Sequence, residues 1–210
     1  MKALQEITNA LKTIRSHREA AENAASQLST EIGKIDSRFS PEIIKDKTAE
    51  LKAKFTPTII ENLRKVSDLN DELRPTTPFW ESRSFVLSQR PITRSENPAD
   101  EAVVRLSRMT EYSKMPLATL ELHLQATKAG GVPKQGELYL VHLEHSSRAG
   151  QPGWEPFSID DVELPDRQEA LTMLNEAKAT QTAIENIWRG AERGSVLPTE
   201  RMTAARAEGA

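Results

Sequence analysis

The opening stretch, residues 3–39, carries the most regular pattern of hydrophobic and polar positions in the chain. Apolar residues recur there at alternating steps of three and four, which places them on one face of a helix. This seam consists of Leu4, Ile7, Leu11, Ile14, Ala21, Ala25, Leu28, Ile32, Ile35 and Phe39, with Arg18 as its charged member. At about 1.5 Å per residue, the helix would be on the order of 55 Å long. The pattern therefore predicts a long helix that needs a partner helix along its apolar face.

The middle of this seam is thin, because Arg18, Ala21 and Ala25 supply little apolar area between two better-filled ends. Large side chains from a partner are expected to insert there. Alanines at neighbouring heptad positions, including Ala10 and Ala24, widen the apolar face toward that of a helical bundle. Two arrangements stay open: a bundle closed within one chain, which we favour, and a coiled coil between chains.

A second long helix is predicted after a turn at Ser40, which can cap it, and Pro41, which suits its first turn. Helical spacing continues over residues 44–73, where Pro57 is expected to kink or restart the helix. Asn70 stands at a core position of the heptad pattern. It is either buried, fixing the register, or solvated near a fraying helix end, and we favour the solvated position. Two antiparallel helical arms joined at Ser40 would account for both apolar seams.

Residues 74–97 change character, because three prolines interrupt any continuous helix. We expect an extended connector that is anchored by its aromatic side chains, with a short edge strand at 84–88. Its arginines, Arg74, Arg83, Arg90 and Arg94, outnumber Glu81 and give residues 74–94 a charge of +3. Basic residues interleaved with Phe79, Trp80 and Phe85 are typical of single-stranded nucleic-acid binders. We favour a structural connector with solvated or paired arginines over nucleic-acid binding or a protein-docking site.

The stretch 98–145 predicts helices, with one ambiguity. Asn97 and Pro98 form a good helix start, and the helical spacing that follows runs to about Ser113. Residues 118–126 alternate between apolar and polar, and 137–145 are similarly ambiguous, so a β-hairpin is an alternative there. Leucine-rich composition, few β-branched residues and the Gly130-Gly131 pair favour two short helices instead.

Residues 151–165 are polar and acidic, and their prolines and glycine predict an irregular loop tethered by Trp154, Phe157 and Ile159. A last strong helix is predicted from about Pro165 to Trp188, with Gly190 as its stop and with heptad spacing that makes it a third candidate member of the bundle. The small and charged residues 191–210 predict a mobile tail or a short helix that orders only against a partner.

Composition limits the function classes further. A chain of 210 residues with 5% aromatic residues is poorly supplied for a large spherical core. The net charge of −3 gives no overall attraction to nucleic acid or to an acidic membrane. The absence of cysteine excludes disulfides and thiolate chemistry and fits a reducing compartment. No long apolar run predicts a membrane span, so a cytoplasmic protein, or a virion protein if viral, is expected.

Chemistry-bearing motifs are scarce. His142, Glu144 and His145, with His123 alongside if the hairpin forms, could ligate zinc, but their spacing matches no zinc framework. The acidic residues Asp160, Asp161, Glu163, Asp166 and Glu169 could hold a hard cation or perform acid-base work, although such runs are usually solvated. Phosphate-binding loops and nucleophile elbows are missing. We therefore predict no catalytic, cofactor-binding or metal-binding residues and no enzyme activity.

These patterns together predict a mainly α-helical, elongated protein: a helical hairpin or coiled-coil arm (1–73), a connector (74–97), a smaller helical region (98–190) and a tail (191–210). The expected function is a non-enzymatic structural or assembly protein whose partners are copies of itself or other subunits. Alternatives are a nucleic-acid-associated protein that uses the connector and a metal-dependent enzyme. Residues expected to contact a partner are Leu4, Ile7, Leu11, Ile14, Arg18, Leu28, Ile32, Ile35, Arg74, Phe79, Trp80, Arg83, Arg90 and Arg94.

Similar helical, cysteine-free, charged chains are common among viral and phage assembly factors, scaffolding proteins included; this is a likeness of composition, and no residue motif identifies a family. The charge pattern adds one expectation. The basic connector of one copy could meet the acidic loop of another, in which case salt would weaken self-association.

Overall fold

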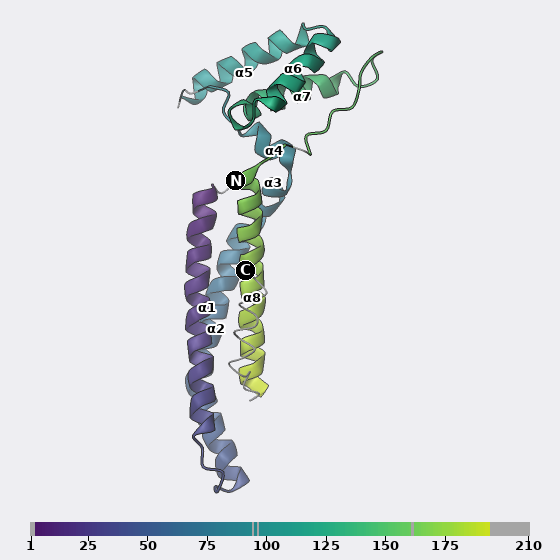
Figure 1. Cartoon of the computed structure of the whole chain (residues 1–210). Coiled ribbons are helices and arrows are strands. Elements are labelled where there is room, and N and C mark those ends of the chain that lie inside the picture. Colours follow the sequence, from purple (N-terminus) through teal and green to yellow (C-terminus); the bar gives the residue numbers. More distant parts are fainter. Residues whose placement is uncertain (1–2, 94, 96, 161, 194–210) are drawn as a thin grey trace. The chain divides into compact units, whose positions relative to one another are not determined.

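The computed structural model describes residues 3–93, 95, 97–160 and 162–193, and in these ranges the protein is all-helical (Figure 1). The chain divides into two units. The bundle unit comprises Met1–Pro75 and Thr172–Ala210, and the small unit comprises Thr76–Leu171. Within the bundle unit the long helices α1, α2 and α8 pack together, which confirms the predicted helical bundle and the third member expected from the last helix.

Helix α1 spans Leu4–Gly33 and follows the predicted seam, with Ile7, Leu11, Ile14 and Leu28 buried. The helix is shorter than the expected 3–39. It ends where Lys34 N–H bonds back to the Glu31 and Ile32 carbonyls, and Asp36 then accepts from the backbone N–H of Arg38 in a turn. A local side-chain-to-backbone bond of this kind competes with helix continuation, which explains the earlier end.

Helix α2, Pro41–Leu73, begins as predicted: Ser40 is the N-cap, and its hydroxyl accepts from the Ile43 N–H at 3.4 Å. The expected restart at Pro57 is wrong, because the helix continues through this residue. The preference for a solvated Asn70 is also wrong. Its Nδ2 donates to the Ala177 carbonyl at 3.1 Å and to Gln181 Oε1 at 2.8 Å, so it ties α2 to α8.

Helix α8, Pro165–Arg193, begins in the small unit and continues in the bundle unit. The predicted stop at Gly190 is wrong, because the helix runs three residues further, into the expected tail. Residues 194–210 of that tail lie outside the described residues. Arg15 of α1 donates twice to the carboxylate of Glu176 at 2.7 Å, and Lys52 of α2 donates to the Glu192 carbonyl at 2.9 Å. Contacts therefore join α8 to both arms.

The expectation of an extended connector is wrong. It forms a 3₁₀ turn, Arg74–Thr76, and two short helices, α3 (Thr77–Glu81) and α4 (Arg83–Ser88), so the edge strand expected at 84–88 is also wrong. The prolines do not prevent these helices, because Pro78 stands in a first turn, where no N–H bond is lost. Ser82 caps α4 by accepting from the Phe85 N–H at 3.2 Å.

The small unit also contains α5 (Pro98–Ser113), α6 (Leu117–Ala129), a 3₁₀ turn (Val132–Lys134) and α7 (Gln135–Ser147). These bounds confirm the helix predicted after Asn97 and the two short helices, and the alternative strands at 118–126 and 137–145 are wrong. Gly131, at φ 65°, provides the break between them. Gly136 admits the backbone of Arg90 and Pro91, whose carbonyl oxygens would lie 2.6 Å from a Cβ at that position.

The segment between α7 and α8 is irregular, as predicted, and two aromatic residues tether it. Trp154 Nε1 donates to the His145 carbonyl at 2.9 Å, and the Phe157 ring lies 6.0 Å from that of His142. Among the described helices, none is both long enough and apolar enough to cross a membrane.

Candidate functional site

The far end of the helical hairpin carries exposed apolar side chains. We define the hairpin tip as residues 29–58, which are the end of α1, the turn and the first half of α2. The structure describes all of these residues, and none of them is buried. Buried residues return on α1 at Leu28 and on α2 at Ile59. The tip is thus a continuous stretch without a core of its own.

The last described turn of α8 lies beside the hairpin tip. It ends at Arg193, where Lys52 contacts Glu192, and Figure 1 shows α1 and α2 continuing past its end. Three helices can enclose a shared apolar seam, whereas two helices leave one side of it open. Among the described residues, the loss of burial at the tip therefore accompanies the last described turn of α8, while the apolar pattern of α1 and α2 continues.

Large apolar side chains occupy this open stretch. Ile32 and Ile35 are half-buried, while Phe39 and Ile43 are 39% and 43% exposed. Lys47 partly shields Phe39, because its Nζ lies 4.6 Å from the centroid of the Phe39 ring. Exposed apolar side chains that follow one another along a seam are typical of protein contact surfaces.

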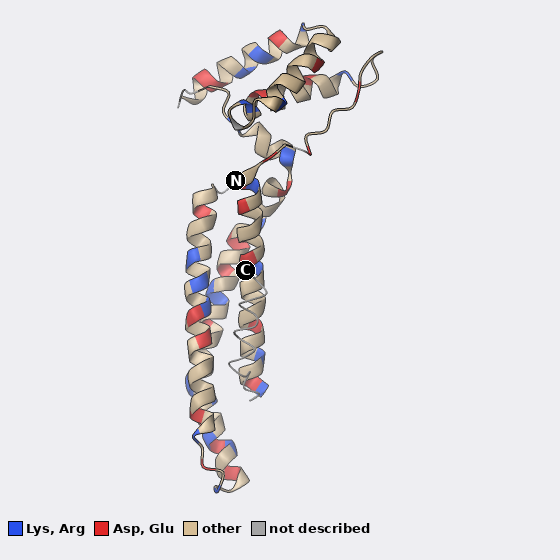
Figure 2. Ribbon diagram, viewed as in Figure 1, with Lys and Arg blue, Asp and Glu red and all other residues tan. Residues whose placement is uncertain are grey.

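Charge is mixed along the tip, where basic and acidic residues alternate (Figure 2). Six basic and five acidic side chains give residues 29–58 a net charge of +1. A nearly balanced surface exerts little long-range attraction on a polyanion, and it is compatible with a partner of equally mixed charge. A second copy of the same hairpin meets that requirement.

Other residues of the predicted seam lie inside the bundle unit. Leu4 is half-buried, and Ile7, Leu11, Ile14 and Leu28 are buried. In the thin middle of the seam, Ala21 is buried, Ala25 is half-buried and Arg18 pairs with Glu22 at 2.7 Å. Of the predicted seam, Ile32 on α1 and Ile35 and Phe39 beyond its end lie in the open stretch.

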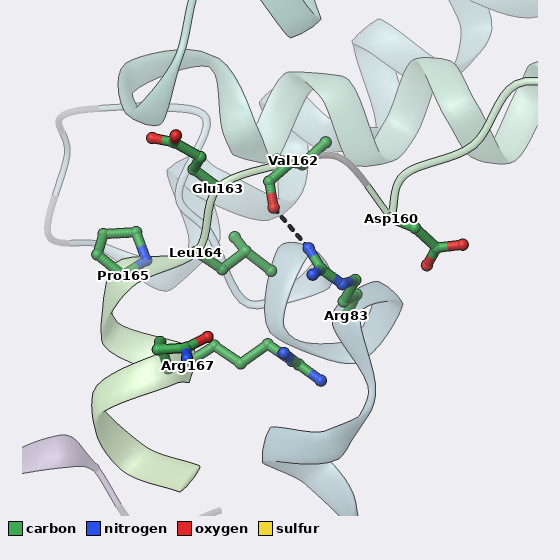
Figure 3. A pocket seen from close by; sticks show the side chains of 8 residues that line it. Arg83, Asp160, Val162, Glu163, Leu164, Pro165 and Arg167 are labelled. Carbon is green, nitrogen blue, oxygen red and sulfur yellow. Dashed lines mark hydrogen bonds between the residues drawn. The ribbon is translucent and has the colours of Figure 1, made fainter. Parts of the chain in front are cut away.

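The connector arginines that the structure describes contact groups within the chain. Arg83 Nη1 donates to the Val162 carbonyl at 2.6 Å, beside a cavity of about 310 Å³ that Arg167 also lines. Figure 3 shows both guanidinium groups extending toward this space, while the carboxylates of Asp160 and Glu163 point away from them. Arg167 donates to the Glu81 carbonyl at 2.9 Å. Arg83 thus joins α4 to the segment before α8, and Arg167 joins the start of α8 to α3.

The remaining connector residues follow the same pattern. Arg90 forms an ion pair with Asp166 at 2.5 Å, Arg74 lies 3.2 Å from Asp71, and Arg94 lies outside the described residues. The aromatic residues anchor the segment, because Trp80 is buried and Phe79 stacks on Phe85 with centroids 4.7 Å apart. Basic connector and acidic segment therefore meet within one chain.

The histidines do not converge. His123 lies 3.4 Å from Glu137, His145 lies 3.6 Å from Glu121, and Glu144 pairs instead with Arg148 at 2.8 Å. Asp161 of the acidic run lies outside the described residues. In the part of the chain that the structure describes, no three of these side chains are grouped to hold a metal ion.

Glu137 forms a buried polar cluster. Its carboxylate accepts from Tyr112 at 2.9 Å and from Lys134 at 2.7 Å. Burial by itself would raise the pKa of Glu137, but the hydrogen bonds from Lys134 and Tyr112 hold that pKa below its usual value. Burial, and then the bond to the carboxylate, raise the pKa of Tyr112. Glu137 thus remains an anion whose oxygens are already engaged, which is the arrangement of a structural cluster joining α5 to α7.

Comparison of the chain with protein-family models, with curated proteins and with solved structures found no match.

Proposed function

We propose that this chain is a non-enzymatic assembly protein that associates with copies of itself through the hairpin tip. One observation carries the proposal: the apolar rhythm of α1 and α2 continues through residues 29–58, yet none of these residues is buried. Two hairpin tips laid side by side would supply the helices that each tip lacks and would form a four-helix section.

The surroundings of the tip support this choice of partner. The positive and negative charges of residues 29–58 nearly balance, so two copies of the tip would not repel each other strongly. The apolar side chains lie along a helical seam, as they do where helices associate. The composition resembles that of virion and scaffolding components, and we include such an assembly, in the cytoplasm or in a virion, in the proposal. The contacts of Arg83 and Arg90 within the chain favour a structural connector over the nucleic-acid alternative.

Light scattering coupled to size exclusion tests the proposal, with the variant Ile43→Asp and the matched control Ile60→Asp. Both isoleucines lie on α2 at similar exposure, 43% and 46%, but only Ile43 belongs to the tip. A charge at position 43 should weaken self-association at least about tenfold, because it would be buried in the contact without a counter-ion. The control should keep the wild-type mass.

Measurements at low and high salt distinguish an apolar contact between copies from an electrostatic contact. An apolar tip contact should survive high salt, whereas a contact between connector and acidic segment of different copies should weaken. A wild-type chain that stays monomeric up to high micromolar concentration would overturn the proposal. Equal loss of mass in both isoleucine variants would also contradict it.

A further inference from the structure

A second site lies in the small unit, far from the hairpin tip in sequence. A cavity of about 470 Å³ opens between α6 and the segment that follows α7. Leu122 and Leu124 of α6 and Pro156 and Phe157 of the segment supply apolar walls. Its volume falls in the usual range for small-ligand pockets, about 300–1,000 Å³.

Two aromatic contacts hold the segment over this cavity. The Trp154 ring stacks on His145 of α7, with centroids 5.4 Å apart and planes at 25°. The Trp154 Nε1 hydrogen bond to the His145 carbonyl fixes the same pair a second time. On the Phe157 side, Lys128 Nζ lies 5.2 Å from the ring centroid. The walls of the cavity are therefore formed by side chains of α6 and α7 and by a segment that these contacts hold in place.

Two polar groups at the cavity lack hydrogen-bond partners. His145, which lines it, is 1% exposed, and neither of its ring nitrogens has a hydrogen-bond partner. Glu121 Oε1 is likewise buried without a partner and lies 3.6 Å from His145 Nε2. Buried polar atoms are almost always satisfied in folded proteins, and leaving them unsatisfied is costly. A neutral imidazole offers one acceptor nitrogen, so a donor between the two residues could bond to both.

The charge of the cavity indicates which kind of hydrogen-bond donor it would bind. Glu121 and Glu155 line it, and no lysine or arginine stands among its described lining residues. A cation is favoured there over an anion, and the apolar walls favour one with a hydrocarbon body. The Phe157 ring adds a surface suited to such a body.

We propose that this cavity binds an aliphatic ammonium or guanidinium group, which pairs with the carboxylates of Glu121 and Glu155 while its hydrocarbon chain rests on Leu122 and Phe157. The ligand is either a free organic cation or the side chain of a basic residue on a partner protein. The site is separate from the hairpin tip, so it does not depend on self-association.

Calorimetric titration of the full chain with n-butylguanidinium tests the inference, with n-butanol as the uncharged probe of the same chain length. The cation should bind saturably, with a Kd of about 1 mM or tighter, and the alcohol should not. Glu121→Gln keeps the shape of the side chain and removes its charge, and it should weaken binding at least about tenfold. Glu111→Gln, which changes an exposed carboxylate on α5 outside the cavity, should bind like the wild type.

A capped Gly-Arg-Gly peptide distinguishes the two sources. Binding of both the peptide and n-butylguanidinium would indicate the side chain of a partner, and binding of n-butylguanidinium alone would indicate a free cation. Glu155→Gln gives a second variant on an exposed segment, expected to weaken binding a few-fold, should Glu121→Gln alter the fold. Absence of binding by both probes, or equal binding by Glu121→Gln and wild type, would overturn the inference.

Discussion

The same two helices behave differently along their length. In the three-helix section, which we define as residues 7–28 of α1, 59–73 of α2 and 172–193 of α8, many apolar side chains are buried; in the hairpin tip, the apolar side chains are half-buried or exposed and none is buried. The seam of α1 keeps its spacing across the boundary, with Leu28 buried and Ile32 only half-buried one turn later. An apolar stripe on a helix therefore predicts that the helix packs against another helix, while the burial of its side chains depends on whether that second helix is present.

The largest effect should come from removing side-chain volume on either side of this boundary. Ile14→Ala should lower the free energy of unfolding by about 2–5 kcal/mol, because Ile14 is 0% exposed and its loss leaves a cavity. Ile43→Ala should change it by no more than about 0.5 kcal/mol in the dilute monomer. Urea unfolding followed by circular dichroism measures both. Similar losses in the two variants would mean that the tip is as well packed as the three-helix section.

An intermediate effect is expected from the polar link that holds α8 in place. Asn70→Ala removes the two hydrogen bonds to Ala177 and Gln181 and should cost about 1–3 kcal/mol. Asn9→Ala is the matched control, because Asn9 is exposed and its side chain accepts a local bond from Gln5 on the same helix. The same unfolding measurement applies. An Asn70 variant as stable as the control would show that α8 does not depend on this link.

The smallest effect should be a pH-dependent one from the Arg15–Glu176 pair. The hydrogen bond from Arg15 lowers the pKa of Glu176, so the folded state favours the carboxylate. The pair therefore stabilises the fold above the ordinary pKa of 4.5, and this contribution is lost as pH falls through the lower folded value. Because both groups are partly exposed, the contribution should be about 0.2–1 kcal/mol.

Thermal melting at neutral and acidic pH, with Arg15→Gln beside wild type, checks this last prediction. The variant should lose less stability than wild type on acidification. The control Lys65→Gln changes an exposed pair with Glu61 on α2 alone, so it leaves the contact between α1 and α8 intact. An acid response of Arg15→Gln identical to that of wild type would rule out the pair as a stabilising contact.

Local signals in the sequence were sufficient for much of the fold. Ser40 and Asn97 cap helices because each side chain can accept a backbone N–H close by in the chain, and both caps form. Two predictions that took a single glycine or proline as the end of a helix were wrong. Gly190 does not end α8, and the prolines of the connector do not keep it extended, because a helix that packs against neighbours tolerates a residue of low propensity.

The cavity of the small unit could not be predicted from the sequence. The sequence places His145 beside His142 and Glu144, as a possible metal ligand, but its near neighbour is Glu121 on a different helix. No spacing in the sequence connects two residues that meet only when α6 packs on α7. Phe157 was expected to tether its segment, and its contacts confirm this, while its place in the cavity wall depends on where the segment folds.

By itself, the sequence determined the helices and the faces on which they need neighbours, because periodicity and capping act within a few residues. Only the tertiary structure decided which neighbour each face receives: α8 packs with α1 and α2 in the three-helix section, and its last described turn reaches Lys52 at the edge of the hairpin tip. The physical reason is that burial is a property of several segments at once, so the position of one helix affects the exposure of two others.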